Sequence, residues 1–232
     1  MSDNDIFFDY SFEWSDRPAA CFTMTLDPGD LTLVQAEGLD PAPWTCLSQE
    51  QCPCCPLVES EHPHCPVAVN LQELVTAFKD RVSFDDCTVR CVTPQRTYLK
   101  NTSVMDGLAS IFGIVMATSG CPIMDFLKPM ARFHLPFATI DETTMRSTSM
   151  YLLRQYFAHR ENPNHCFNFD RLENLYSRVQ EVNEGLLARI NSLGHNDADK
   201  NALVTLHSLS QFLSIEIDYS LETLAILFDV PK

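Results

Sequence analysis

Apolar and polar residues alternate near the start of the chain. Phe8, Tyr10, Phe12 and Trp14 occupy every second position, the period at which side chains of a β-strand point to one face. Further alternating positions flank the turn sequence Asp27-Pro28-Gly29-Asp30, in which proline presets φ and glycine accepts a positive φ. We therefore expect two or three antiparallel strands within residues 5–35, with the aromatic stripe in the core.

A second region with strand character covers residues 86–102. Cys87, Val89 and Cys91 alternate with polar or exposed positions, and the turn Thr93-Pro94-Gln95 separates them from another extended stretch. This pattern predicts a hairpin that joins the N-terminal strands in one sheet. Its two cysteines are interpreted as small buried hydrophobes.

Helical periodicity begins at Asn70, which together with Glu73 forms a capping-box pattern. Beyond Thr102 the chain is predicted to be helical throughout. The expected helix starts are Ser103, Ile123, Thr139, Asp170, Asn196 or Asp197, and Ser220. The sequence thus predicts an α+β fold in two parts: residues 1–101 with a small antiparallel sheet, a Cys/Pro-rich loop and one helix, and residues 102–232 as a helical domain.

The loop at residues 38–66 is rich in proline and holds five of the ten cysteines. Proline at this density excludes a helix and disfavours a strand. A loop of this length within a compact domain normally requires a function or an internal crosslink. We interpret it as a loop that is stapled by a metal.

Four cysteines are each followed directly by proline, although the chain has only 14 prolines in 232 residues; they are Cys52, Cys55, Cys65 and Cys121. The spacing Cys52-x-x-Cys55 is typical of zinc and iron–sulfur sites, and Cys65 is a candidate third ligand. Cys121 follows Gly120, the expected end of one helix, and precedes Pro122, which suits the start of the next. As a helix N-cap its thiolate is favoured. The four cysteines are predicted to bind Zn²⁺, with a [4Fe-4S] cluster as the alternative and haem thiolate ligation as a minor one. His62 and His64 are possible replacements for one cysteine, although solvated histidines are the simpler interpretation.

An alternative use of Cys121 is catalysis. In this hypothesis Cys121 is a reactive thiolate, His134 is its base and Arg132 binds an anion. The simpler interpretation of the same region is structural: Asp–Arg and Glu–Arg pairs, including Glu142 with Arg146, hold two helices together.

Composition limits the possible partners. The formal charge of −15 and the pI near 4.7 argue against nucleic acid and anionic membranes, since both require basic surfaces. The acidic N-terminus has no signal-peptide pattern, and no apolar stretch is long enough to span a bilayer. A cytoplasmic protein is therefore expected, in which the cysteines are thiols or metal ligands and the partner is an unknown protein or a small molecule.

Long motifs around these cysteines resemble an uncharacterised bacterial family, a domain of unknown function. They are Cys-Pro-x-Cys-Pro-Leu at 52–57, Cys-Pro-Val-Ala-x-Asn-Leu at 65–71 and the run from Thr118 to Phe137. The resemblance covers about Trp44 to Leu209. It implies that the four Cys-Pro cysteines match cysteines of the family, whereas Cys54 is an addition in this chain. It implies no activity. The leading expectation is a metal-binding protein that acts as a scaffold, sensor or redox partner; the others are a cysteine-dependent enzyme and an interaction module that zinc only stabilises.

Overall fold

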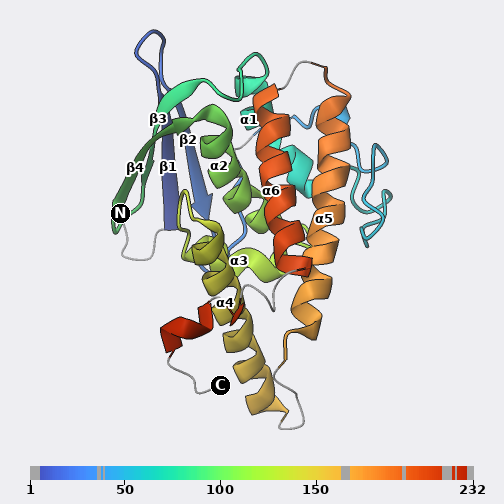
Figure 1. The fold of residues 1–232 in the computed structure, drawn as a ribbon. Coiled ribbons are helices and arrows are strands. Elements are labelled where there is room, and N and C mark those ends of the chain that lie inside the picture. The colour runs from blue at the N-terminus through green and yellow to red at the C-terminus, as the bar shows by residue number, and fades with distance from the viewer. Residues whose placement is uncertain are drawn as a thin grey trace.

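The computed structural model describes residues 6–35, 38, 40–162, 168–194, 197–215, 221–222 and 224–228. Its strands are β1 (Ile6–Glu13), β2 (Ala20–Leu26), β3 (Asp86–Val92) and β4 (Thr97–Ser103). Its helices are α1 (Pro66–Phe78), α2 (Val104–Thr118), α3 (Lys128–Arg132), α4 (Ile140–Glu161), α5 (Asp170–Asn191) and α6 (Asp197–Ile215), with short 3-10 helices η1 (Pro43–Thr45), η2 (Asp125–Leu127) and η3 (Ile226–Phe228). Figure 1 shows the sheet on one side and the α5–α6 pair on the other, with α2 between them. The predicted α+β class is confirmed.

The four strands form one antiparallel sheet in the order β2-β1-β3-β4. β1 joins the N-terminal strand β2 to the predicted hairpin of β3 and β4, because Tyr10 lies opposite Phe22 of β2 and Cys91 of β3. Side chains of the aromatic stripe point into the core, where Phe8, Tyr10 and Phe12 are buried. Alternation of apolar residues along β1 therefore predicted both the strand and its buried face.

Helix α2 lies directly on the sheet, and a glycine makes this approach possible. A Cβ atom at Gly107 would stand 2.5 Å from Cε1 of Phe12 and 2.8 Å from Cγ2 of Val89. One cluster of buried apolar residues then extends from Ile6 on the sheet to Leu213 on α6. The parts predicted as residues 1–101 and 102–232 thus share a hydrophobic core.

Two predicted caps are present. The Ser103 side chain accepts a hydrogen bond from the Asp106 N–H at the start of α2. Thr139 and Glu142 form a reciprocal capping box at the start of α4. At α5 the N-cap is Phe169, without a side-chain hydrogen bond, although the helix begins at the predicted Asp170. The predicted starts at Asn196 and Ser220 lie outside the described residues, as does Cys166.

No helix in the described part of the chain combines the length and the apolar character that crossing a membrane would require.

Candidate metal centre

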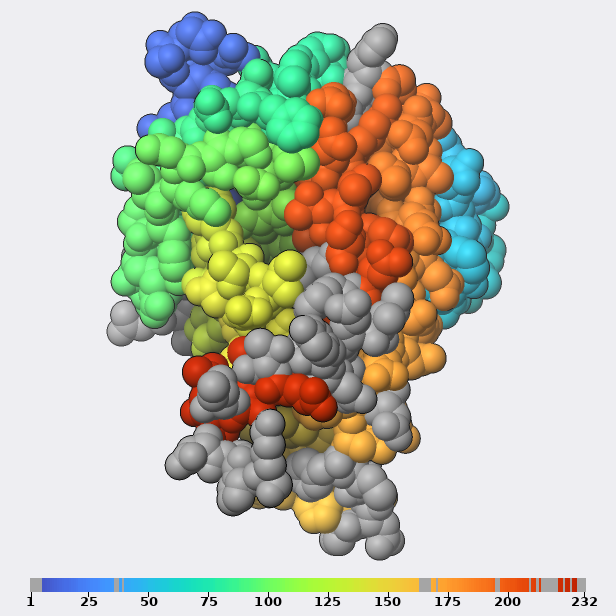
Figure 2. All heavy atoms as spheres, viewed as in Figure 1, coloured from blue at the N-terminus to red at the C-terminus, as the bar shows by residue number. Residues whose placement is uncertain are grey.

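The Cys/Pro-rich loop lies along the flank of α5, where Figure 2 shows its atoms (cyan) beside the helix (orange). Its two arms are joined, since the Leu47 N–H donates to the Pro63 carbonyl at 2.8 Å. At its tip the Cys55 N–H donates to the Cys52 carbonyl at 2.9 Å. This is the tight turn that the Cys-x-x-Cys spacing predicts.

A buried arginine on α5 holds the base of this loop. Arg189 is only 1% exposed, and its guanidinium donates to three backbone carbonyls. Nη1 donates to Trp44 O at 3.1 Å and to Cys46 O at 2.6 Å, and Nη2 donates to Leu47 O at 3.0 Å. The loop is therefore anchored to the helical part by hydrogen bonds that involve no metal.

A glycine on the same helix lets the loop approach closely. A Cβ atom at Gly185 would lie 2.8 Å from Sγ of Cys52 and 3.3 Å from the Glu50 carbonyl oxygen. Gly185 is one turn before Arg189, so both residues face the loop. The Cys52 sulfur consequently rests against bare helix backbone.

Cys65 stands at the junction between the loop and α1. Its N–H donates to Thr45 O at 2.8 Å, and it is the N-cap of α1, with Pro66 as the first helical residue. The prediction that Asn70 is the N-cap was therefore wrong. Asn70 lies one turn inside the helix, and its Nδ2 donates to Pro66 O at 2.8 Å. Proline after Cys65 presets φ for the first turn, so the helix begins earlier than the capping-box pattern indicated.

Cys121 lies where the chain leaves α2. Gly120 has φ of +84°, as expected for the residue that ends a helix. In place of the helix predicted to start at Ile123, the chain forms a turn, the 3-10 helix η2 and the five-residue α3. The cap-like chemistry is nevertheless present, because the Cys121 sulfur accepts hydrogen bonds from the N–H groups of Ile123 and Met124. Burial outweighs these bonds and raises the thiol pKa to about 11.

Four of the cysteines in the described chain act electrostatically on a fifth. The pKa of Cys52 is raised to about 12, mainly by burial and to a smaller extent by negative charge on Cys65, Cys54, Cys121 and Cys55. Charge on Cys65 and Cys55 likewise raises the pKa of Cys121. Such effects extend over several ångströms, so they indicate that these cysteines lie in the same region of the fold. The four Cys-Pro cysteines, from three separate segments, are thus brought to one region of the fold.

Cys54 also lies in this region but faces α5. Its thiol donates to the Arg178 carbonyl at 3.6 Å, and Arg178 Nη2 donates to Cys54 O at 3.4 Å. His64 is hydrogen-bonded through Nδ1 to Thr45 Oγ1 at 2.8 Å. Among the residues that the structure describes, no three His, Cys, Asp or Glu side chains already stand in a metal-binding arrangement.

The predicted partners of Cys121 in catalysis have other contacts. His134 Nε2 and the Tyr10 hydroxyl form a hydrogen bond of 2.7 Å, and burial lowers the His134 pKa to about 3. The Arg132 guanidinium lies over the Phe133 ring at 5.5 Å. Hydrogen bonds and ring contacts of His134 in the described chain do not include Cys121.

In the part of the chain that the structure describes, neither Asp125 nor Glu142 forms the expected ion pair with an arginine. Asp125 pairs with Lys128 at 3.1 Å, one turn along the same segment. The Arg146 guanidinium donates to the Met130 and Phe133 carbonyls at 2.9 and 2.7 Å. Glu142 uses its carboxylate to accept from the Thr139 N–H in the capping box. Backbone groups at helix ends thus compete successfully for the side chains that were expected to pair.

Sequence reasoning missed Arg189 and Gly185, although a signal was present. The buried residues Val182, Leu186 and Ile190 define the inner stripe of α5. Arg189 is three residues after Leu186, which places it beside that stripe, where an arginine must find buried partners. The identity of those partners depends on the loop that packs there.

Comparison with known families identifies a match for this chain. The model of the family described as "Domain of unknown function (DUF6901)" matches residues 8–229, nearly the whole chain. No curated protein and no solved structure matches the chain. The resemblance to an uncharacterised family is thereby confirmed: the chain belongs to the DUF6901 family.

Proposed function

We propose that the protein binds one metal centre through Cys52, Cys55, Cys65 and Cys121. The observation that carries this proposal is the convergence of four Cys-Pro cysteines from the loop tip, the start of α1 and the end of α2. The nine cysteines that the structure describes are free thiols, so none of these four is consumed by a disulfide. Free thiols also agree with the reducing cytoplasm, where we expect the protein to act.

Zinc is the ion that we favour, with a [4Fe-4S] cluster as the alternative. Four thiolates bind Zn²⁺ at about 2.3 Å in tetrahedral geometry. Because burial raises the pKa of Cys52 and Cys121, metal binding must release protons from these thiols, and it must draw the ligand sulfur atoms together. The N–H groups of Ile123 and Met124 would then stabilise one ligand sulfur by hydrogen bonds.

The site would connect elements that the described hydrogen bonds connect only in part. Arg189 already holds the base of the loop, whereas Cys52 and Cys55 at its tip lie beyond that anchor. Metal ligation would tie the tip to α1 and to the end of α2. We therefore propose a centre that is more than a loop staple, with a scaffold, sensor or redox role.

Metal content measured after purification without air tests the proposal. We expect about one zinc per chain, or a brown protein with absorbance near 400 nm if a cluster is bound. Cys52→Ser and Cys121→Ser should each lose most of the metal. The matched control is Cys54→Ser, which lies in the same loop but whose thiol faces Arg178 O, and it should retain the metal. Equal metal content in all four proteins would exclude the site.

The cysteine-dependent enzyme remains the second hypothesis, and selective alkylation tests it. A nucleophilic Cys121 should react with iodoacetamide before the other cysteines of the metal-free protein. Its burial and raised pKa predict slow reaction instead.

A further inference from the structure

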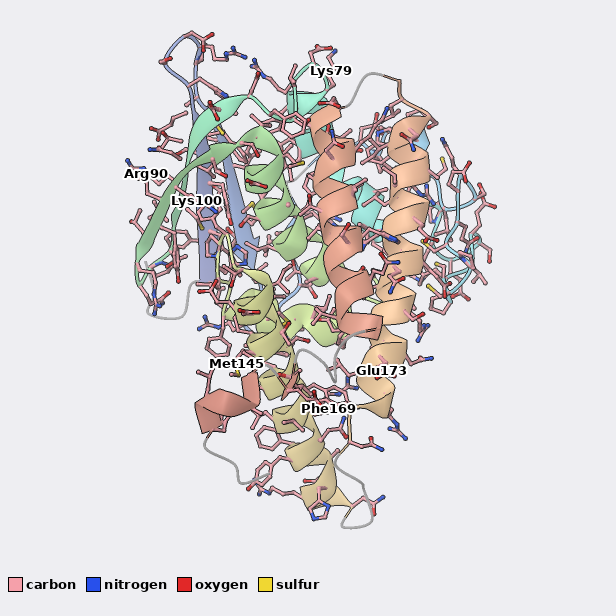
Figure 3. All side chains as sticks on the ribbon, viewed as in Figure 1. Lys79, Arg90, Lys100, Met145, Phe169 and Glu173 are labelled. Atoms are coloured by element: carbon pink, nitrogen blue, oxygen red, sulfur yellow. The ribbon has the colours of Figure 1, made fainter. Side chains whose placement is uncertain are left out.

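Helix α4 (Ile140–Glu161) has its polar and apolar faces reversed. Its buried side chains all end in hydroxyl or amide groups, and they are Thr143, Thr144, Ser147, Thr148, Tyr151 and Gln155. This polar face packs on α5, because the Ser147 hydroxyl lies 2.8 Å from the Tyr176 hydroxyl. The Tyr151 ring also stacks at 6.1 Å on Phe169, which Figure 3 labels beside α4 at the start of α5. The side of α4 that contacts the protein is thus the kind that usually faces water.

The exposed side of α4 carries four large apolar side chains within six residues. Their exposed fractions are 38% for Leu152, 54% for Leu153, 48% for Tyr156 and 53% for Phe157. At about 100° per residue these side chains cover about 140° of the helix circumference, so they form one surface, the α4 apolar stripe. Figure 1 shows that the C-terminal half of α4, which carries the stripe, extends beyond the sheet and α2. An apolar surface of this kind marks an interaction site.

The spacing along this side of α4 fits a second helix. Six residues follow one another at intervals of four, four, three, four and four positions, and they are Asp141, Met145, Ser149, Leu152, Tyr156 and Arg160. Alternating intervals of three and four form the seam of two helices that pack side by side. Leu153 and Phe157 widen this seam on one flank.

The same intervals indicate that the second helix is another copy of α4. They are identical when read from either end, as an antiparallel pair about a two-fold axis requires. In that pairing Leu152 of each copy meets Ser149 of the other, and Tyr156 of each meets Met145 of the other. No residue of the seam is then left without an opposite position.

The charges at the two ends of α4 fit the antiparallel pairing. The first turn is acidic, with Asp141, and the last turn is basic, with Arg160. Arg160 follows Tyr156 by one turn, so it lies in line with the stripe. An antiparallel pair places each acidic first turn beside the basic last turn of the other copy, whereas a parallel pair places like charges together. Because the whole chain has a formal charge of −15, two copies require such a local match in order to associate.

The area of the stripe is sufficient for a dimer. Four large side chains that are about half exposed present about 400 Å² per copy, or about 800 Å² in a pair. Met145 and the charged ends add to this area, which brings it to the total of about 1,000 Å² that a specific interface requires.

We propose that a second copy of this chain covers the α4 apolar stripe, with the two α4 helices antiparallel about a two-fold axis. Arg160 of each copy would pair with Asp141 of the other. Dimerisation through α4 does not depend on the proposed metal centre, whose ligands lie in the Cys/Pro-rich loop and at the ends of α1 and α2.

Sedimentation velocity of the full chain between about 1 and 200 µM tests the association. We expect a shift from monomer to dimer with increasing concentration. Leu152→Glu should raise the dissociation constant at least about 100-fold, because two charges would be buried in one symmetric interface. The matched control is Leu99→Glu, the same change at an exposed leucine on β4, which should leave the dissociation constant unchanged. A monomer at every concentration, or an equal effect of both variants, would overturn the proposal. Flotation of such a monomer with phosphatidylcholine vesicles would assign the stripe to lipid instead.

Exchange of the terminal charges tests the antiparallel arrangement. Asp141→Lys and Arg160→Glu should each weaken the dimer about tenfold, since each places like charges opposite one another at two positions. The double variant restores opposite charges and should dimerise like the wild type. If these charges served only to complement the helix dipole, the double variant would be the least stable of the three. Circular dichroism establishes that each variant is folded, and the wild-type concentration series decides if one is not. A double variant that is folded but does not recover the dimer would refute the antiparallel pairing.

Discussion

Replacing Arg189 by methionine removes the three hydrogen bonds that anchor the Cys/Pro-rich loop to α5. Methionine has a similar length and keeps the apolar contacts of the side chain, so the change isolates the guanidinium. The Trp44, Cys46 and Leu47 carbonyls would lose these donors at a site where the side chain is 1% exposed. Water does not replace such bonds unless the loop moves away from the helix.

The expected loss of stability follows from the number of bonds. Hydrogen bonds from charged donors contribute about 1.5 kcal/mol or more each, so three contribute about 4.5 kcal/mol. These values are net of desolvation, so we expect the free energy of unfolding to fall by about 4 to 5 kcal/mol. For a chain of this size, the melting temperature would fall by about 10 °C.

Urea denaturation of the metal-free protein measures the global effect, and alkylation followed by mass spectrometry measures the local one. Loop thiols such as Cys52 should react faster in Arg189→Met, whereas the core thiols Cys87 and Cys91 should not. The matched control is Arg171→Met, an exposed arginine on the same helix, which should change stability by less than about 0.5 kcal/mol. If Arg189→Met is within about 1 kcal/mol of this control and its loop reacts no faster, the anchoring role is refuted.

Three further changes test other parts of the structure. Gly185→Ala should weaken metal retention and destabilise the protein by about 1 to 3 kcal/mol, because its Cβ would lie 2.8 Å from the Cys52 sulfur. A metal content and a urea midpoint equal to those of the wild type would contradict the close approach of the loop to α5. Gly107→Ala should destabilise by a similar amount where α2 meets the sheet, whereas Gly113→Ala, with open space around its Cβ, should stabilise by up to about 1 kcal/mol in thermal melts. Burial lowers the His134 pKa to about 3, so below pH 6.5 the unfolded chain binds a proton at this histidine that the folded chain does not. The free energy of unfolding should therefore fall by up to about 1.4 kcal/mol per pH unit between pH 6.5 and 3. In urea titrations, His134→Gln should lack this contribution to the pH dependence.

Much of the secondary structure follows from short-range patterns. Alternation along residues 8–14 predicted β1 and its buried face, and the capping pattern of Thr139 predicted where α4 begins. The start of α1 was misplaced because two signals competed, a capping-box pattern at Asn70 and a proline directly after Cys65. Proline governs φ at the first turn by covalent geometry, so it determines the start when another residue can act as N-cap.

The candidate site likewise has one feature that the sequence shows and contacts that the sequence does not show. Proline after cysteine is a local feature, and it was sufficient to select four of the ten cysteines. Contacts between distant segments leave no comparable mark, since the Arg189 carbonyl partners are more than 140 residues away. Such partners are selected only when the helices pack and expel water, because burial then requires each polar group to find a donor or acceptor.

The sequence by itself therefore determined the α+β class and most of the element starts, since each depends on residues a few positions apart. Only the tertiary structure decided that Cys52 rests against α5 at Gly185, that Arg189 holds the Cys/Pro-rich loop through hydrogen bonds, and that Cys121 and His134 face different surroundings. The physical reason is the range of the interactions. Backbone geometry and side-chain period act within one or two turns, whereas burial and hydrogen bonding between segments depend on the complete packed core.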